Sequence, residues 1–569
     1  MFPKLGPEQI AALDRFGRRV QTRPGDVLVD VGERPREFFV VVSGSLDLET
    51  PLDSSKYEFV YRLTPGDFTG ELSTLRGSAG LVRISAGEPG TIIALDVERL
   101  RSIVQDDAVL SELFMRAFIL RRMGMLAGGY GDVMLVGSGS SADTLRLREF
   151  LSRNGYPFLD VDIERDPQVK EILDRFVIRP QDIPVVIAHG RRICRNPSNR
   201  ELADQLGFNP EADTGQVHDV LIVGAGPAGL AAAVYAASEG LDVRVVETTA
   251  PGGQAGTSSR IENYLGFPTG ISGQALAGRA LAQAQKFGAH LSVAWQAERL
   301  SCEQWPYRVR MSDGSWVLTR SIVIASGAQY RALDLPHLSR YLGAGVHTAA
   351  THLEARLCQD QEIAIVGGGN SAGQAAVFLA ASCRHVHVLV RSAGLADSMS
   401  RYLIRRIQEN PRITLHPRTE LIALDGAERL ERVTWRVSTD GAIENRTIEH
   451  VFMMTGAIPH TRWLAGCVAL DDRGFVRTGS ALTHEEIAAA GWPEGAVPEL
   501  FETSVPGVFA VGDVRAGSVK RVASAVGEGS VCVSFVHRFL AGRPLPVVGL
   551  PQRSRSSDEG PATGASPTA

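Results

Sequence analysis

The sequence has no pair of cysteines spaced as Cys-x-x-Cys, the pattern typical of dithiol redox motifs and of many zinc sites. Its six cysteines are scattered, and none stands with histidines at the spacing of a metal site. We therefore expect six reduced, mostly buried thiols and no bound metal. The cysteines are Cys194, Cys302, Cys358, Cys383, Cys467 and Cys532.

Long hydrophobic runs and an excess of positive charge are also missing. No run of about 18 apolar residues occurs, so we expect no membrane span. The N-terminal segment has no apolar stretch of the kind found in secretory signals. The net charge of −5 offers no basic surface that would displace counterions from nucleic acid. These absences predict a cytoplasmic protein whose main partner is not a nucleic acid.

What is present is a multidomain chain. With 569 residues, of which 44% are hydrophobic and 22% charged, it is globular in composition and too long for one core. The patterns described next predict units at 1–127, 131–210, 217–333, 334–455 and 456–545, followed by a disordered tail at 546–569.

Short strands and turns fill the first unit, and a helical pattern runs from about residue 96 to 125. This predicts a small antiparallel β-barrel or jelly roll with helices. The stretches PGD, FFVVVSGSLDL and GDFTGEL resemble the cyclic-nucleotide-binding domain of bacterial regulators. The resemblance implies that Gly70 and Glu71 hold the cyclic phosphate and the ribose. The family's phosphate-pairing arginine is missing at 77–79, which favours a structural or partner-binding barrel instead.

The second unit alternates strands and helices in the order βαβαβα. Strands are expected at 133–136, 158–163 and 184–188, and helices at 143–154, 167–175 and 198–206. This α/β order, with Pro184 opening the last strand, resembles a thioredoxin- or glutaredoxin-like domain whose proline is cis. The place of the redox cysteines reads Ser138-Gly139-Ser140-Ser141, and hydroxyls cannot exchange disulfides. The resemblance therefore implies a redox-inactive unit that serves docking or dimer geometry.

A strand at 220–223 runs into a GxGxxG motif, followed by a helix at 230–239 and a strand that ends in Glu247. Strand, glycines, helix and an acid at this spacing are a strong signature of a Rossmann-like dinucleotide-binding domain. The first glycine allows a tight turn, the second lets a pyrophosphate approach backbone N–H groups, and the third lets the helix pack on the strand. Glu247 is expected to hold the adenosine ribose. The loop residues expected at the cofactor are Gly224, Gly226, Pro227, Ala228 and Gly229.

A second such motif follows a strand at 363–366 and precedes a helix to about 380 and a strand at 386–390. Its loop residues are Gly367, Gly368, Gly369, Asn370 and Ser371. Two dinucleotide folds predict two dinucleotides, and the natural pair is a flavin and a nicotinamide cofactor. Glycine crossings at 322–328, which include Gly327, and at 452–457 indicate that the second domain is inserted into the first.

Further stretches carry a closer likeness: Gly252-Gly253-Gln254, Ile261-Glu262-Asn263-Tyr264, Gly266-Phe267-Pro268 and the VFAVGDVR sequence that contains Gly512 and Asp513. With them, residues 217–544 resemble the low-molecular-weight, bacterial-type thioredoxin reductase. The resemblance implies FAD and NADPH as cofactors, domain rotation and a homodimer. It also implies that Gly253, Gln254, Asn263 and Asp513 line the flavin, and that a helix starting at 525–529 faces the pyrimidine end of the ring.

The sequence departs from that family at the dithiol. Relatives carry the redox Cys-x-x-Cys just before the second glycine loop, where this chain has Ala349 and His352 in place of the two thiols. A relay from flavin to disulfide is therefore not expected. His352 is either a proton donor beside the flavin or a polar filler. Cys358 is a single thiol, which would support disulfide reduction only through a partner's cysteine pair.

The basic cluster that reads the 2′-phosphate of NADPH in relatives is also reduced here. Arg391 keeps one position of that cluster, and Arg401, Arg405 and Arg406 follow on a helix. Because no acid replaces the missing arginines, NADPH is favoured over NADH.

The sequence as a whole predicts an FAD-dependent pyridine-nucleotide oxidoreductase of thioredoxin-reductase type that passes hydride from NAD(P)H to FAD. The acceptor stays open among a quinone, oxygen, a small disulfide and a partner protein, and the N-terminal unit would modulate the reaction. The alternative is a flavin-based redox or nucleotide sensor with little turnover. The barrel and the cysteine-less unit favour the sensor, whereas the two intact loops favour the enzyme.

Overall fold

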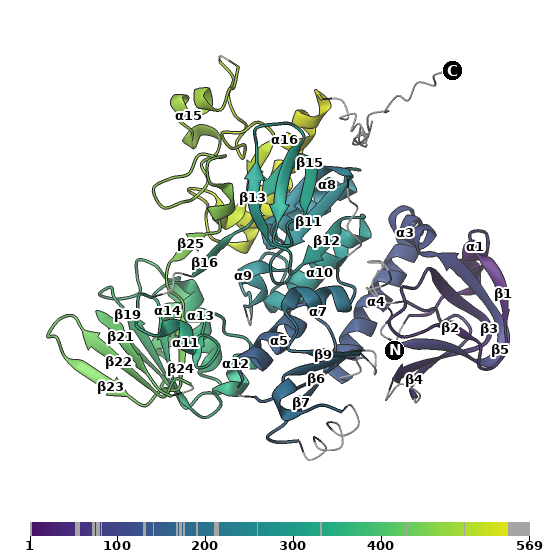
Figure 1. Ribbon diagram of the computed structural model, residues 1–569, viewed down its shortest axis with the longest axis horizontal. Coiled ribbons are helices and arrows are strands. Elements are labelled where there is room, and N and C mark those ends of the chain that lie inside the picture. The colour runs from purple at the N-terminus through teal and green to yellow at the C-terminus, as the bar shows by residue number, and fades with distance from the viewer. Residues whose placement is uncertain are drawn as a thin grey trace, which may run out of the picture.

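The computed structural model describes four packed units (Figure 1). The described residues are 3–51, 57–70, 74, 80, 82–128, 133–139, 141–166, 169, 173, 177–188, 192–209, 215–258, 260–330, 333–427, 429–493 and 495–543. We call the units the barrel domain (3–128), the middle unit (133–209), the split domain (215–330 and 457–543) and the inserted domain (333–453). None of the helices within these ranges is long and apolar enough to cross a membrane. The expected tail at 546–569 lies outside the described residues.

The barrel domain is built on a five-stranded antiparallel sheet. Its elements are α1 (Pro7–Asp14), β1 (Arg18–Thr22), β2 (Val27–Val29), β3 (Glu37–Pro51), β4 (Tyr57–Leu63), β5 (Arg83–Asp96), α3 (Val97–Asp106) and α4 (Ala108–Gly128). Rings of Phe38, Phe68, Phe114 and Phe118 pack together between the sheet and α4. The single helix expected from 96 to 125 is two helices, because the Asp107 carboxylate accepts hydrogen bonds from the N–H groups of Val109 and Leu110 and starts α4 anew.

The middle unit has a four-stranded sheet in the order β7-β6-β8-β9, in which β6 and β7 are parallel and β8 is antiparallel to both of its neighbours. Its elements are β6 (Val133–Gly137), α5 (Ala142–Arg153), β7 (Leu159–Asp162), η1 (Pro180–Asp182), β8 (Val185–Ala188), β9 (Arg192–Arg195) and α7 (Asn199–Gln205). The Ile183–Pro184 peptide bond is cis, as predicted. Strand β9 was not predicted, and most of the helix expected at 167–175 lies outside the described residues.

The split domain is a mixed sheet in the order β12-β11-β10-β15-β14-β13, with β26 beside β15. Its strands are β10 (Val217–Val223), β11 (Val243–Glu247), β12 (His290–Val293), β13 (Ala297–Ser301), β14 (Tyr307–Met311), β15 (Trp316–Ile324) and β26 (Val508–Ala510). Its helical segments are α8 (Pro227–Ser238), α9 (Gly253–Gly256), α10 (Gly273–Lys286), η2 (Arg462–Leu464), η3 (Gly479–Ala481), α15 (His484–Ala489), η4 (Gly512–Val514) and α16 (Val522–Ala541). Helix α8 is rich in alanine, and α10 and α16 both pack against it.

The inserted domain has a parallel sheet in the order β17-β24-β18-β19-β20 and a three-stranded antiparallel sheet beside it. Its elements are α11 (Leu338–Tyr341), β17 (Val346–His347), α12 (His352–Leu357), β18 (Glu362–Val366), α13 (Asn370–Leu379), β19 (His385–Val390), α14 (Arg401–Gln408), β20 (Ile413–Pro417), β21 (Thr419–Asp425), β22 (Arg432–Val437), β23 (Ile443–Arg446) and β24 (His450–Met453). Both chain crossings to the split domain run through one antiparallel ribbon of β16 (Ala328–Tyr330) and β25 (Ala457–Pro459).

The middle unit is fixed to the split domain through the C-terminal end of α5. The Asn154 side chain donates to the Thr249 carbonyl over 3.1 Å, and Val293 of β12 packs into the core of the middle unit. Of the residues in the place of redox cysteines, Ser138, Gly139 and Ser141 stand at the other end of α5, about 18 Å from this contact at about 1.5 Å per residue. A second contact comes from α7, where Arg200 pairs with Asp313 of the split domain over 3.4 Å. The barrel domain and the inserted domain lie on opposite sides of this pair (Figure 1).

The expectation of six reduced thiols is wrong for one pair. Cys302 follows β13, Cys467 follows η2, and the two form a disulfide across 165 residues of sequence. Because the two cysteines meet only in the folded protein, their spacing in the sequence did not predict the disulfide. The other four cysteines are free, and Cys358, Cys383 and Cys532 are buried.

Acid should weaken the inserted domain through His387 of β19. Burial, with the neighbouring His416 and His385, lowers the pKa of His387 to about 4. Since an unfolded histidine titrates near pH 6.5, the unfolded chain binds more protons between about pH 6.5 and pH 4, and stability falls with pH by about 1.4 kcal/mol per unit there. The urea concentration at the unfolding midpoint should be lower at about pH 5 than at about pH 7.5. The decrease should be smaller in His387→Phe, which keeps a ring against Trp435. Equal drops in both proteins would contradict this.

Candidate functional site

One continuous cavity of about 3070 Å³ is lined mainly by residues of the split and inserted domains, with Glu149 and Arg153 of the middle unit at its edge. It brings together almost all of the predicted cofactor residues: Gly224, Gly226, Pro227, Ala228, Glu247, Gly253, Gln254, Asn263, Gly327, Gly367, Gly368, Gly369, Asn370, Ser371, Arg391, Gly512 and Asp513. Among the described side chains, only Gly229 of the predicted cofactor residues is not in the lining. The two glycine loops, about 140 residues apart in sequence, therefore open on the same space.

The first glycine loop has no room for side chains where it touches the protein. Gly224 has φ +105°, and a Cβ on it would lie 2.3 Å from the Ala325 carbonyl oxygen. A Cβ on Gly229 would lie 1.9 Å from the Gly224 oxygen, which is the helix–strand packing predicted for it. At Gly226, by contrast, the nearest atom to a Cβ is 3.9 Å away. The loop is thus closed toward the sheet and open toward the cavity, where the N-terminus of α8 favours an anion.

Glu247 ends β11 beside this loop. One oxygen of its carboxylate accepts from the Ala225 N–H over 2.7 Å, and the other accepts from the Thr249 N–H over 2.9 Å. These bonds hold the carboxylate at the cavity edge. Each oxygen keeps a further lone pair for a hydroxyl donor such as a ribose.

The second loop repeats the first. Gly367 has φ +146°, and a Cβ there would lie 2.2 Å from the Met454 carbonyl oxygen. Gly369 caps α13, and a Cβ on it would meet nothing within 4 Å. The Asn370 side chain accepts from the Ser400 N–H over 2.7 Å, which ties the loop to the segment before α14.

Of the four arginines considered for a 2′-phosphate, Arg391 alone lines the cavity. Arg405 pairs with Glu409 on its own helix over 2.8 Å. Arg406 pairs over 2.9 Å with Glu262 of the split domain. The suggestion that α14 adds its arginines to the phosphate site is therefore not supported by their positions, because two of them already have carboxylate partners.

The flavin end of the predicted site is formed by η4 and α16. Gly512 donates its N–H to the Glu528 carboxylate over 2.7 Å, and Arg515 forms an ion pair with the same carboxylate over 2.6 Å. Burial raises the pKa of Asp513, although Lys520 acts in the opposite direction. Sequence reasoning missed Glu528 as a support of this turn; a lone carboxylate in the apolar first half of the helix was the available signal.

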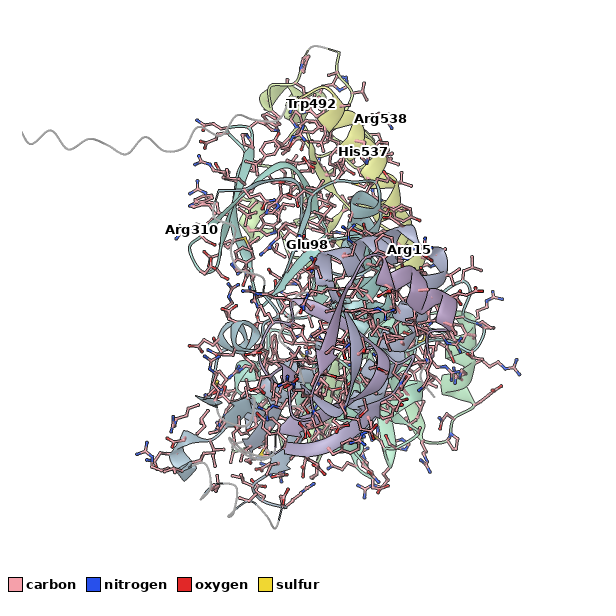
Figure 2. All side chains as sticks on the ribbon, turned by 90° about the vertical axis from the view of Figure 1, so that its right-hand side faces the viewer. Arg15, Glu98, Arg310, Trp492, His537 and Arg538 are labelled. Atoms are coloured by element: carbon pink, nitrogen blue, oxygen red, sulfur yellow. A yellow bond between two sulfur atoms is a disulfide. The ribbon has the colours of Figure 1, made fainter. Side chains whose placement is uncertain are left out.

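Helix α16 begins at Val522, three residues before the predicted start, so Ala525 to Gly529 occupy its second turn. The earlier start follows from the extended backbone of Arg521, after which the chain turns helical. A Cβ on Gly529 would lie 2.1 Å from the Ala228 oxygen, so α16 is packed closely on α8. On the outer face of the same helix, His537 and Arg538 pair with Glu239 and Glu499 (Figure 2).

The segment in which the resemblance expects a dithiol faces the cavity. Thr348, Ala349 and Ala350 line it, and Ala350 forms a parallel β-bridge with Ser258 of the split domain. Gln254, predicted at the flavin, donates a side-chain hydrogen bond to the Ala328 carbonyl nearby. His352 begins α12, and its side chain lies outside the described atoms.

No cysteine of the described chain lines the cavity. Cys302 lies four residues beyond Glu298, the last lining residue of β13, which is about 13 Å along an extended strand. Cys358 is fully buried, and a hydrogen bond with Cys383, together with burial, raises its pKa. Such a thiol is a poor nucleophile toward a partner's disulfide.

The predicted effector residues of the barrel domain are only partly visible. Gly70 has φ +88°, and its carbonyl accepts a hydrogen bond from Arg121 of α4 over 2.9 Å. Glu71 lies outside the described residues. Cyclic-nucleotide binding therefore stays a prediction.

Comparison with known proteins agrees with this arrangement. The chain matches the pyridine nucleotide-disulphide oxidoreductase family over residues 218–529 and the cyclic nucleotide-binding domain over residues 19–107. The first match spans more than half of the chain, so the protein belongs to the pyridine nucleotide-disulphide oxidoreductase family and carries an N-terminal cyclic nucleotide-binding domain. Within that family its oxidoreductase body is of the kind shared by thioredoxin reductases and alkyl hydroperoxide reductases.

Three relatives illustrate the likeness. The chain is 32% identical over 325 residues to a thioredoxin reductase of Mycolicibacterium smegmatis, covering 57% of this chain and 97% of the relative. It is 31% identical to NADPH-dependent thioredoxin reductase 3 of Arabidopsis thaliana, covering 63% and 67%. In structure it resembles T. acidophilum thioredoxin reductase with a TM-score of 0.50 at 25% identity, covering 57% of this chain and 99% of that one.

Proposed function

We propose that this chain is an FAD-dependent NAD(P)H oxidoreductase that delivers electrons to an acceptor without a dithiol relay of its own. The observation that carries the proposal is the single cavity, which is lined by both glycine loops and by no cysteine of the described chain. Membership in the family supports the pairing of a flavin with a pyridine nucleotide.

The residues present fit FAD in the split domain. The open face of Gly226 and the N-terminus of α8 would hold the pyrophosphate, and Glu247 would accept from the adenosine ribose. Asp513, positioned by the Glu528 contact with Gly512, would bind the ribityl chain. When bound, the flavin supplies the hydride acceptor and electron donor that no side chain provides.

The inserted domain would hold NADPH along the loop from Gly367 to Ser371, with Arg391 pairing the 2′-phosphate. In this structure the cavity-facing segment of the inserted domain is bridged to the split domain at Ser258 and Ala350. The ribbon of β16 and β25 is the covalent connection between the two domains, so the inserted domain would rotate about it. This rotation would replace the cavity-facing segment beside the flavin by the nicotinamide ring.

The remaining units would serve recognition. The middle unit has no cysteine at 138–141, so it would act in docking or dimer geometry rather than in electron transfer. The barrel domain contacts the split domain through Gln105, which donates to the Lys286 carbonyl over 3.0 Å, and would modulate turnover by this route. Because of the resemblance to bacterial-type thioredoxin reductases, we also propose that the protein is a cytoplasmic homodimer.

Anaerobic mixing of the FAD-loaded full chain with NADPH should bleach the flavin, and a quinone or dye acceptor should sustain turnover. Arg391→Ala should weaken NADPH binding about tenfold or more and leave NADH binding nearly unchanged, because it removes one charge-assisted contact. Arg405→Ala, which removes an arginine already paired with Glu409, is the matched control. Flavin that stays oxidised under both nucleotides would refute the enzyme. Flavin that is reduced by the nucleotide but passes its electrons to none of the acceptors would favour the redox sensor.

A further inference from the structure

Three possible metal ligands meet behind the cavity-facing segment of the inserted domain. His347 is the last residue of β17, His450 is the first residue of the neighbouring strand β24, and Cys358 follows α12. One donor atom of each lies within 4.8 Å of the other two. The group is formed by three separate elements, so the spacing along the chain, from which no metal was expected, could not reveal it.

The separation of the two imidazoles suits a tetrahedral ion. Nε2 of His347 and Nδ1 of His450 are 2.9 Å apart, and the ring centroids are 5.2 Å apart. Zinc bonds of about 2.0–2.1 Å to nitrogen and about 2.3 Å to sulfur would put two ligating nitrogens about 3.3 Å apart and nitrogen and sulfur about 3.5 Å apart. The two nitrogens would need to move apart by only a few tenths of an ångström. The present distance between the ring centroids already fits two imidazoles bound to one tetrahedral ion.

The protonation states of the two histidines also suit a metal. Burial lowers the pKa of His347 to about 3, and burial with nearby Arg429 lowers the pKa of His450 to about 4, so both rings are neutral near pH 7. Arg429 is itself paired with Glu449 over 3.8 Å, which reduces its repulsion of a cation. The Cys358 thiol, whose pKa is raised, has to lose its proton to bind the ion, and Cys383 is hydrogen-bonded to it.

We propose that His347, Cys358 and His450 bind one Zn²⁺ ion. Binding replaces the S–H bond of Cys358 by an S–Zn bond and releases that proton to solvent, while the proton shared between the imidazoles moves to the outer nitrogen of its ring. Neutral imidazoles and a thiolate are donors that bind zinc in proteins. No nucleotide or flavin takes part.

The position gives the ion a definite task. His347 and Cys358 bracket residues 348–357, and the first three of these line the cavity and include Ala349. An ion bound to both brackets would fix the ends of the segment that stands where relatives carry their redox cysteines. We expect the site to hold this segment in place after the loss of the dithiol, rather than to perform chemistry.

Metal content and affinity of the full chain test the proposal. After chelator dialysis, the protein should take up one Zn²⁺ per chain, as measured by competition with a chromogenic chelator. His347→Ala and Cys358→Ala should each weaken affinity by at least about 100-fold, because even outer-shell partners change metal affinity by 10- to 100-fold. Cys532→Ala is the matched control, a fully buried cysteine of the split domain that belongs to no group of three possible metal ligands among the described residues.

A second measurement keeps the test decisive if a variant folds poorly. Co²⁺ bound to the wild type should give intense tetrahedral bands at wavelengths longer than flavin absorption, and Zn²⁺ should raise the Tm of the wild type and of Cys532→Ala. No Co²⁺ bands in the wild type, or equal zinc affinity in wild type and Cys358→Ala, would overturn the site. These readouts need no turnover, so they do not depend on the proposed enzyme activity.

Discussion

Replacing Ala349 and His352 with cysteine should let the protein store two more electrons per flavin. Ala349 lines the cavity, and the segment that carries it is bridged to the split domain at Ser258, so the new pair would stand where relatives keep theirs. In anaerobic titration the wild type should consume one equivalent of NADPH per flavin and the double variant two. Turnover of a small aromatic disulfide should rise at least about 100-fold, since the wild type has no sulfur pair at the cavity.

A variant with only one new cysteine shows whether the extra electrons need a pair of thiols. Ala349→Cys alone adds one cavity thiol, which cannot store two electrons as an intramolecular disulfide, and should stay at one equivalent. A further variant, Cys302→Ser with Cys467→Ser, removes the remote disulfide and should also stay at one. A wild type that consumes two equivalents would contradict our view that the present sulfurs are outside the electron path.

Gly229→Ala should remove flavin from the protein and destabilise the split domain by about 3 kcal/mol or more. The new Cβ would lie 1.9 Å from the Gly224 carbonyl oxygen and 3.2 Å from Ala325, and neither backbone can move without opening the loop. The measurements are the flavin-to-protein ratio after purification and the urea unfolding midpoint.

Gly278→Ala is the matched control because it makes the same change in helix α10, where a Cβ meets nothing within 4 Å. Alanine is favoured over glycine in a helix by about 0.5–1 kcal/mol, so this variant should be slightly more stable and fully flavinated. Opposite signs for one substitution in two helices would show that contact, not helix propensity, sets the requirement at Gly229. Equal effects would contradict it.

Two separate features point away from a thioredoxin-type relay. The cavity-facing segment has Ala349 and His352 where the resemblance expects thiols, and the middle unit has hydroxyls or glycine at 138–141. The middle unit contacts the split domain through Asn154 and Arg153 at the C-terminal end of α5 and through Arg200 of α7.

The sequence alone determined the parts of this protein that follow from local order along the chain. A buried strand, three glycines, a helix and an acid fix a dinucleotide loop within about 25 residues, and 17 of the predicted cofactor residues do line one cavity. The cis Pro184 and the absence of a Cys-x-x-Cys pattern were equally local facts. Each depends on neighbouring residues, whose geometry the backbone itself dictates.

Tertiary structure alone decided what depends on residues far apart in sequence. It joined Cys302 to Cys467, paired Arg406 with Glu262 across two domains, and assembled His347, Cys358 and His450 from three elements. It also decided which end of α5 meets the split domain. No periodicity or spacing encodes such meetings, because they are set by how buried faces of separate elements pack once the whole chain has folded.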